Sequence, residues 1–168
     1  SETISVSGTV SPASVGGTIT GSAAVCSGTN SITLTLSGNT GSISKWQSST
    51  SANFSSAIDI TNTTTSLTAS NLTTTTYYIA VVKSGSCDAA NSGTATITVS
   101  PVSVGGTIAG SASVCSGTNS TTLILSGQTG TVVKWQSASD EDFLTNLVNI
   151  TNASTSYTVT NLTTSLYF

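Results

Sequence analysis

An internal repeat constrains this chain more than any other feature of its sequence. Residues 15–47 and 104–136 are nearly identical, and an offset of 89 residues relates Cys26 to Cys115. The offset becomes 90 after an insertion that follows Phe54. Solenoid repeats are shorter than this, whereas an immunoglobulin-like domain has roughly 100 residues. The repeat therefore predicts small independent domains in tandem.

The frame of the repeat predicts the domain boundaries. The segment Thr-Val-Ser-Pro ends at Pro12 and occurs again at Pro101. We therefore expect residues 1–11 to be the last strand of a preceding repeat and residues 12–100 to be a complete repeat. Residues 101–168 would be a second repeat that stops before its final strand or strands. Short linkers that contain proline restrict hinge motion more than Gly/Ser tethers do.

Alternation of apolar and polar residues predicts an all-β fold. Thr is abundant and β-branched, and it suits a pleated, half-wet surface. The chain lacks a stretch of ten or more residues with the 3.6-residue apolar period of a helix. Seven strands at regular spacing indicate tandem immunoglobulin-like (fibronectin-III-like) β-sandwich domains. In the first repeat we expect these strands at 17–20, 31–37, 42–48, 58–61, 66–70, 75–84 and 93–100.

Large apolar side chains mark the expected core. Trp46 points inward in the alternation, with Lys45 and Gln47 outward. The strand around Tyr78 resembles a tyrosine corner, in which the hydroxyl bonds back to the main chain. In the second repeat Phe168 takes that position, so this hydrogen bond would be missing there. The predicted core residues are Leu34, Leu36, Trp46, Tyr78, Leu123, Leu125 and Trp135.

Composition excludes several functional classes. Charged residues are 5% of the chain, the net charge is −3, and the cations are three lysines, with no histidine. A nucleic-acid binder needs a basic face, and His-dependent catalysis or zinc ligation needs histidine. The longest apolar run, 77–82, is far short of the roughly 20 residues of a transmembrane helix. We expect no nucleic-acid partner, no membrane span and no cofactor.

The three cysteines favour a disulfide between Cys26 and Cys87, although other interpretations stay open. A Cys26–Cys87 disulfide would stabilise the first repeat by roughly 4 kcal/mol and would indicate an oxidising, extracellular compartment. However, these positions fall at opposite ends of a plain seven-strand sandwich. Cys26 would then lie further along, a strand would be missing or extra, or both thiols would be free. Cys115 is expected to be unpaired.

The other candidate sites are weak. Asp140 and Asp142 could offer oxygen ligands to Ca²⁺, but the first repeat has Ser51 and Asn53 there, which favours a solvated loop. Lys45 and Lys134 point outward, so neither a Ser–Lys nucleophile nor a Lys–Asn isopeptide cross-link is expected. We therefore expect no enzymatic activity.

Hydroxyl-rich segments supply two further patterns. Thr-x-Thr rows could bind ice or sugar, but Thr also simply fills solvent-facing strand positions. Asn-x-Ser/Thr triplets arise freely in such a composition, and they are glycosylation acceptors only in a host that glycosylates secreted proteins. These triplets begin at Asn53, Asn62, Asn71, Asn119, Asn149, Asn152 and Asn161.

The blocks VCSGTNS, KWQSS and NLTTTTYY resemble the immunoglobulin-like repeats of giant cell-surface adhesins of Bacteroidota, in particular the SprB-type gliding-motility adhesins. The resemblance covers nearly the whole chain and offers no catalytic residues. It implies type IX secretion, display at the cell surface, and adhesion to surfaces or polysaccharide.

The leading hypothesis is a non-enzymatic spacer repeat of an extracellular adhesin filament, with neighbouring repeats as its partners. Residues 1–10 could also complete a unit of another molecule end to end, because unpaired strands invite pairing. The alternatives are a carbohydrate-binding module, and a surface-layer or phage structural component. Sugar stacking would need exposed aromatic residues, for which the candidates are Phe54, Tyr77, Phe143 and Tyr157.

Overall fold

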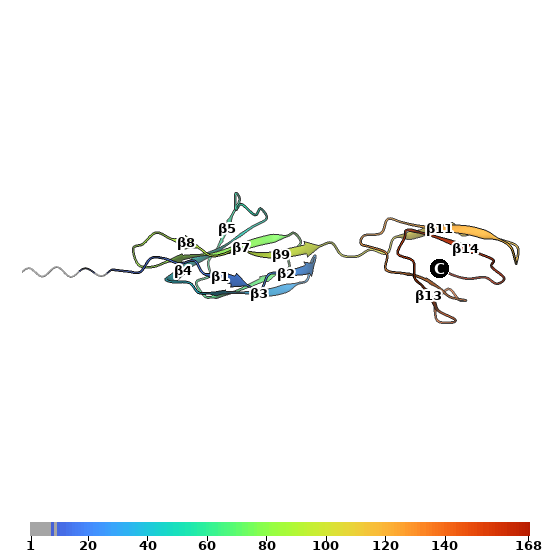
Figure 1. Ribbon diagram of the computed structural model, residues 1–168, viewed down its shortest axis with the longest axis horizontal. Coiled ribbons are helices and arrows are strands. Elements are labelled where there is room, and N and C mark those ends of the chain that lie inside the picture. The colour runs from blue at the N-terminus through green and yellow to red at the C-terminus, as the bar shows by residue number, and fades with distance from the viewer. Residues whose placement is uncertain (1–7, 9) are drawn as a thin grey trace, which may run out of the picture. The chain divides into compact units, whose positions relative to one another are not determined.

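The computed structural model describes residue 8 and residues 10–168, and the chain divides into two compact units at Pro101/Val102. The predicted strand in residues 1–10 lies almost wholly outside the described residues. Each unit consists of strands, turns and loops (Figure 1). The described part of the chain contains no helix that is long and apolar enough to cross a membrane.

The first unit is a two-layered sandwich of nine strands. One sheet has the order β1-β3-β6, and the other has the order β2-β9-β7-β4-β5, with β8 paired to β7. The strands are β1 (Thr18–Thr20), β2 (Ala23–Cys26), β3 (Ser31–Ser37), β4 (Ser42–Ser49), β5 (Ile58–Ile60), β6 (Ser66–Ser70), β7 (Thr76–Lys83), β8 (Ala90–Asn91) and β9 (Ala95–Ser100).

Strand order identifies the sandwich type. Neighbouring strands pair antiparallel except β2 and β9, which are parallel with Ala23 opposite Ile97 and Cys26 opposite Ser100. A small sheet facing a larger one through crossover connections is the immunoglobulin-like arrangement. The predicted fold class, an all-β immunoglobulin/fibronectin-III-like sandwich, is confirmed.

Alternating side chains of both sheets form the core of the first unit. Along β3, Leu34 and Leu36 are buried, whereas Thr33 and Thr35 between them are exposed. Trp46 on the facing β4 has no exposed surface. Strands β7 and β9, which belong to the same sheet as β4, complete this core with buried small and branched side chains, namely Ala80, Val82, Ala95 and Ile97.

The second unit repeats one sheet and part of the other. Strands β10 (Thr107–Ala109), β11 (Ser120–Ser126) and β14 (Ser156–Thr160) reproduce β1-β3-β6, while β12 (Trp135–Ser137) pairs with β13 (Val148–Ile150). In Figure 1, β11 and β14 lie in one layer of this unit and β13 in the other. Leu123, Trp135 and Val159 form the buried cluster.

The structure corrects two details of the sequence prediction. Strands β2 and β8 were not expected, because β2 is a short edge strand and β8 spans two residues. Leu125, predicted as core, is only half-buried and packs at the margin of its cluster. Its counterpart Leu36 is buried, so the difference comes from what surrounds the residue rather than from the residue itself.

Candidate functional site

An asparagine side chain ties two turns of the first unit together. Asn30 Nδ2 donates to the carbonyl oxygens of Cys26 (2.9 Å) and Leu72 (2.8 Å), and Asn30 Oδ1 accepts from the Leu72 amide at 2.9 Å. The Asn71 amide also donates to the Asn30 carbonyl, and Asn71 has a positive φ of 54°. The VCSGTN and NLTT segments are thereby joined.

We call these hydrogen bonds of the Asn30 side chain the asparagine clamp, and the same clamp recurs in the second unit. Asn119 Nδ2 donates to the carbonyls of Cys115 and Leu162, both at 2.8 Å, and its Oδ1 accepts from the Leu162 amide at 2.8 Å. Asn119 also begins an Asn-x-Ser/Thr triplet, which the composition alone explains as a chance match. The same asparagine ends both VCSGTN blocks, and this repetition is the sequence signal that could have indicated its structural role.

Other Asn-x-Ser/Thr triplets have a structural reason. Asn62 Oδ1 accepts from the Thr64 amide (2.7 Å) and hydroxyl (2.9 Å), and Asn62 Nδ2 donates to the Ser66 carbonyl. Asn152 and Ser154 repeat this turn. An Asx turn uses the amide two residues on, where Ser or Thr reinforces the turn with its own hydroxyl. The triplet is therefore a turn motif at both places.

Each tryptophan packs in the core of its unit and also donates a hydrogen bond from its indole N–H to a turn. Trp46 Nε1 donates to the Thr64 carbonyl at 3.0 Å, and Trp135 Nε1 donates to the Ser154 carbonyl at 2.9 Å. Tyr78 is buried, and burial raises the pKa of its hydroxyl. The predicted tyrosine-corner hydrogen bond is not found among the described residues, so Tyr78 serves the core by its ring.

A polar trio crosses the outer face of β4 and β5. Lys45 Nζ lies 2.8 Å from Asp59 Oδ2, and Gln47 Nε2 donates to Asp59 Oδ1 at 2.7 Å. Two hydrogen bonds hold the pKa of the Asp59 carboxyl below its ordinary value. The one from Lys45 has the larger effect and the one from Gln47 the smaller. Exposed ion pairs of this kind add little stability.

In the second unit Asn149 replaces the aspartate of that trio. Its Oδ1 accepts from Lys134 Nζ at 2.8 Å and from Gln136 Nε2 at 2.9 Å. A lysine beside an asparagine is the residue pair of an isopeptide cross-link. Lys134 and Asn149 are both exposed, however, and a nucleophilic lysine needs a buried setting that activates its amine. The predicted outward direction of these lysines agrees with this geometry.

The acidic loop of the second unit uses its first carboxylate internally. Asp140 Oδ1 accepts from the Leu144 amide at 2.8 Å, and Oδ2 accepts from the Thr145 amide. The hydrogen bond from the Leu144 amide is the largest of the effects that hold the pKa of the Asp140 carboxyl below its ordinary value. Across the residues described, no three Asp, Glu, His or Cys side chains gather as a metal site would require. The structure gives Asp140 and Asp142 a loop role.

The expected Cys26–Cys87 disulfide is wrong for this structure, because all three cysteines are free. Cys26 ends β2 beside Ser100, whereas Cys87 follows the far end of β7. Since β7 spans eight residues at about 3.3 Å each, the two thiols lie at opposite ends of one sheet. Cys26 and Cys115 are exposed, and Cys87 is half-buried.

The candidate aromatic residues for sugar stacking do not form an exposed platform. Phe54, Tyr77, Phe143 and Tyr157 are each half-buried. Tyr157 packs against Trp135, with ring centroids 5.8 Å apart, and against Phe168 at 5.9 Å. Phe54 and Phe143 both have a φ of 56° at matched loop positions, which is uncommon for a bulky side chain.

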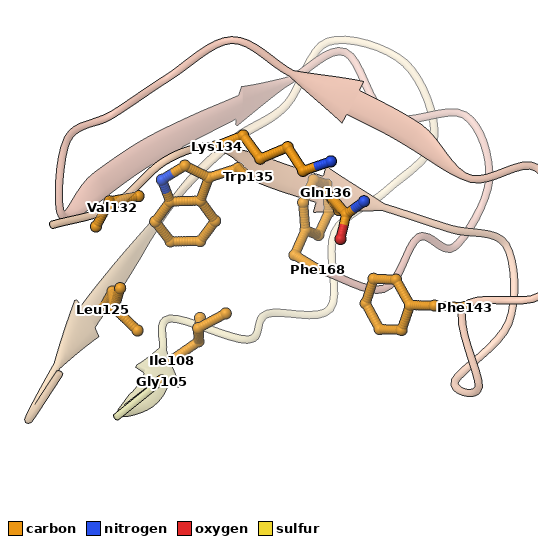
Figure 2. Close-up of a pocket in the computed structure, with 9 residues that line it drawn as sticks. All are labelled: Gly105, Ile108, Leu125, Val132, Lys134, Trp135, Gln136, Phe143 and Phe168. Carbon is orange, nitrogen blue, oxygen red and sulfur yellow. The ribbon is translucent and has the colours of Figure 1, made fainter. Parts of the chain in front are cut away.

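A hollow of about 350 Å³ lies beside Trp135 in the second unit. Figure 2 shows Trp135, Val132, Leu125 and Ile108 around this space, with Phe168 and Phe143 on its other side. The matched residues of the first unit include Ile19, Leu36, Ile43, Trp46 and Tyr78, all of which belong to or pack against its core cluster.

The hollow is therefore the interior of the sandwich rather than a ligand pocket. A Cβ at Gly16 would meet the Asn91 carbonyl of β8 at 1.9 Å, whereas a Cβ at the matched Gly105 would meet nothing within 4 Å. The second unit has no counterpart of residues 79–100 among those described, and these residues supply β8, β9 and most of β7.

Comparison with known proteins agrees with a repeated domain. The family described as "Domain of unknown function (DUF8696)" matches residues 15–101 and again residues 104–168. No curated protein matches the chain. Among solved structures, the crystal structure of chicken CNTN1 FN1–FN3 domains matches with 17% identity and a TM-score of 0.31. The match covers 91% of this chain and 59% of that one, so this chain spans about three fifths of its length. The chain belongs to the DUF8696 family and carries two of its domains.

Proposed function

We propose that this chain is a non-enzymatic spacer of a cell-surface adhesin, in which successive sandwich units transmit tension along the polypeptide. The observation that carries the proposal is the parallel pairing of β2 with β9. In the larger sheet, β2 is the strand nearest in sequence to the N-terminal end of the first unit, its entry. β9 is the strand nearest to the C-terminal end, its exit.

The direction of the two strands makes their hydrogen bonds resist tension together. Force applied at the entry is carried first by the Val15–Thr40 bridge and by β1, and once these yield it pulls β2 from its Ala23 end. Force at the exit pulls β9 from its Ser100 end. Because the strands are parallel, the two pulls are opposed along a common axis. The hydrogen bonds of the ladder are then sheared together instead of being opened one at a time.

The rest of the unit suits a mechanical role. The entry segment is fastened to the sandwich, since Val15 and Thr40 exchange two backbone hydrogen bonds at 3.0 and 3.1 Å. Ser and Thr supply a polar surface with few charges, so that repeated units do not repel one another strongly. The Asn clamp and the Trp anchor recur in both units and hold their turns.

The proposed setting is the outside of a bacterial cell. It rests on the resemblance of VCSGTNS, KWQSS and NLTTTTYY to repeats of Bacteroidota surface adhesins of the gliding-motility type. Type IX secretion and contact with surface polysaccharide belong to this proposal. The disulfide that would have indicated an oxidising compartment is not formed within a unit and gives it no support.

Single-molecule force spectroscopy on the whole chain tests the mechanical role. The Ser27 amide donates to Ser100 at 2.8 Å, so by alternation the Val25 amide also faces β9 and the Ala24 amide faces away. Val25→Pro should lower the unfolding force of the first unit, and Ala24→Pro should lower it much less. Val25→Ala measures the side-chain contribution alone. Equal forces for both proline variants would contradict the proposal.

A further inference from the structure

The first unit begins with a segment that precedes its strands. Residues 11–17 come before β1, and within them Val15 forms an isolated bridge with Thr40. The two backbone hydrogen bonds of this bridge are 3.0 and 3.1 Å long. A matched bridge joins Val104 and Thr129 within the second unit. We call residues 11–17 the entry latch of the first unit.

Separate contacts hold the entry latch to different parts of the first unit. The Ser84 amide, in the turn after β7, donates to Ser14 Oγ at 2.9 Å. The Gly93 amide, between β8 and β9, donates to the Gly17 carbonyl at 2.9 Å. The bridge partner Thr40 lies in the turn between β3 and β4. A pull on the latch therefore loads these contacts one after another.

A glycine allows the latch to lie close against β8. Gly16 is buried, and a Cβ at this position would lie 1.9 Å from the Asn91 carbonyl oxygen and 2.5 Å from the Ser92 nitrogen. Gly16 does not have a positive φ, so the close approach to β8, rather than the backbone conformation, requires glycine here. Any side chain at this position should push the latch away from the unit.

The latch also covers a thiol. Cys87 Sγ lies 3.5 Å from the Pro12 carbonyl oxygen and 3.8 Å from that of Ser11, and Cys87 is half-buried. Cys26, by contrast, is exposed. The rate at which a small reagent alkylates Cys87 therefore reports whether the latch is closed, and Cys26 provides an internal reference.

We propose that the entry latch opens under tension before the sandwich unfolds, which lengthens the chain and uncovers Cys87. The latch contacts break in sequence, whereas the parallel ladder from Ala23 to Cys26 is sheared as a whole. Pairing of β1 with β3 stops the opening at Thr18. Because the buried core cluster contains no latch residue, the core stays intact and the latch recloses when tension falls. The inference rests on the proposed mechanical role, since the latch opens only if tension reaches the entry.

Alkylation of the whole chain with iodoacetamide, followed by peptide mass mapping, tests the latch without force. Gly16→Ala should raise the alkylation rate of Cys87 about tenfold, because the latch opens locally while the unit stays folded. Gly93→Ala is the matched control, since a Cβ there meets only the Gly17 carbonyl at 3.9 Å. Cys26 should react at the same rate in both variants. An unchanged Cys87 rate in a folded Gly16→Ala chain would overturn the proposal.

A reversible lock tests the opening under force and does not depend on the Gly16 variant. Val15 and Thr40 exchange both backbone hydrogen bonds, so their Cα atoms should be about 5.5 Å apart, within the range of roughly 4.4–6.8 Å that a disulfide spans. Val15→Cys and Thr40→Cys, in a chain with Cys26→Ser and Cys115→Ser, allow a disulfide to close the latch.

Force-clamp measurements on the oxidised and reduced forms of this locked chain isolate the latch of the first unit. The reduced chain should show a short, reversible extension before the first unit unfolds, and the oxidised chain should lose it. An extension that is the same in both forms, or absent from both, would contradict the proposal. If only this step fails to respond while Val25→Pro still lowers the unfolding force, the latch is wrong and the sheared ladder stands. Equal forces for the two proline variants would have the opposite meaning.

Discussion

The first and second units carry matched sequence blocks, but their interiors differ. The sheet β1-β3-β6 and its counterpart β10-β11-β14 have matching registers: Leu34 lies opposite Leu67 as Leu123 lies opposite Tyr157. Trp46 is fully buried and Trp135 is 5% exposed, with a hollow beside it. The smaller sheet forms in the same way in both units, and of the larger sheet the described second unit holds the β12–β13 pair and the Ala138–Tyr167 bridge.

The difference shows which strands depend on distant partners. β4 runs for eight residues because β7 pairs with it from Ser42 to Ser49. Its counterpart β12 covers three residues, those that pair with β13. Residues 112–115 match β2 but form no strand, since the described chain offers no partner like β9. Pairing across the larger sheet, rather than local sequence, decides strand length there.

The largest expected effect comes from a change that opens the interior of the first unit. Ile97 on β9 is fully buried against the core. Ile97→Ala should cost about 2–5 kcal/mol of the free energy of unfolding, since it removes apolar contacts and leaves a cavity. Urea unfolding followed by Trp46 fluorescence in a Trp135→Phe background measures the cost. The neighbouring, exposed Thr98→Ala is the control and should change stability by less than about 0.5 kcal/mol. Equal effects of the two variants would show that β9 does not close the core.

The asparagine clamp should contribute to the stability of both units, because both contain the same three hydrogen bonds. Asn30→Ala and Asn119→Ala each remove three side-chain hydrogen bonds to main-chain groups. At about 0.5–1.5 kcal/mol for each bond, the expected cost is roughly 1.5–4.5 kcal/mol in either unit. Amide hydrogen exchange at Leu72 and Leu162 reports the two clamps separately. Loss of protection at only one of the two sites would break the equivalence.

The smallest expected effect concerns pH. The pKa of Asp59 is lowered by hydrogen bonds from Lys45 and Gln47, so the pair stabilises the folded first unit above the unfolded-state pKa. This contribution is lost as the pH falls through the lower folded-state pKa. Lys45→Gln should raise the titration midpoint of the Asp59 carboxyl, followed by ¹³C NMR. Asn149 does not titrate, so Lys134→Gln is the matched control, and an unchanged midpoint in Lys45→Gln would rule out the pair.

Much of the first unit could be predicted from sequence because its strands alternate cleanly. Ser31–Ser37 and Ser66–Ser70 form with the predicted bounds, and Trp46 faces inward as expected. β2 was missed because Ala-Ala-Val-Cys carries little alternation and becomes a strand only beside β9. Leu125 was predicted as buried from its own strand, but its burial depends on residues across the sandwich.

The polar sites were harder to predict because their partners are far apart in sequence. Asn30 and Leu72 are 42 residues apart, and only the turn geometry brings them together. The disulfide prediction relied on the cysteine count of one repeat and was wrong. The expected strand order already indicated that Cys26 and Cys87 lie at opposite ends of the sandwich, and in the structure β7 separates these two free thiols.

The central claim is that residues 79–100 close the interior of the first unit around Trp46, whereas the described residues 102–168 of the second unit contain no counterpart of them. The two tryptophans test it directly, since each unit holds one. Urea unfolding of Trp135→Phe reports Trp46 alone, and unfolding of Trp46→Phe reports Trp135 alone. We expect Trp46 to show the bluer emission and a cooperative transition at higher urea, with Trp135 redder and unfolding earlier. Coincident transitions with the same emission maximum would contradict the account.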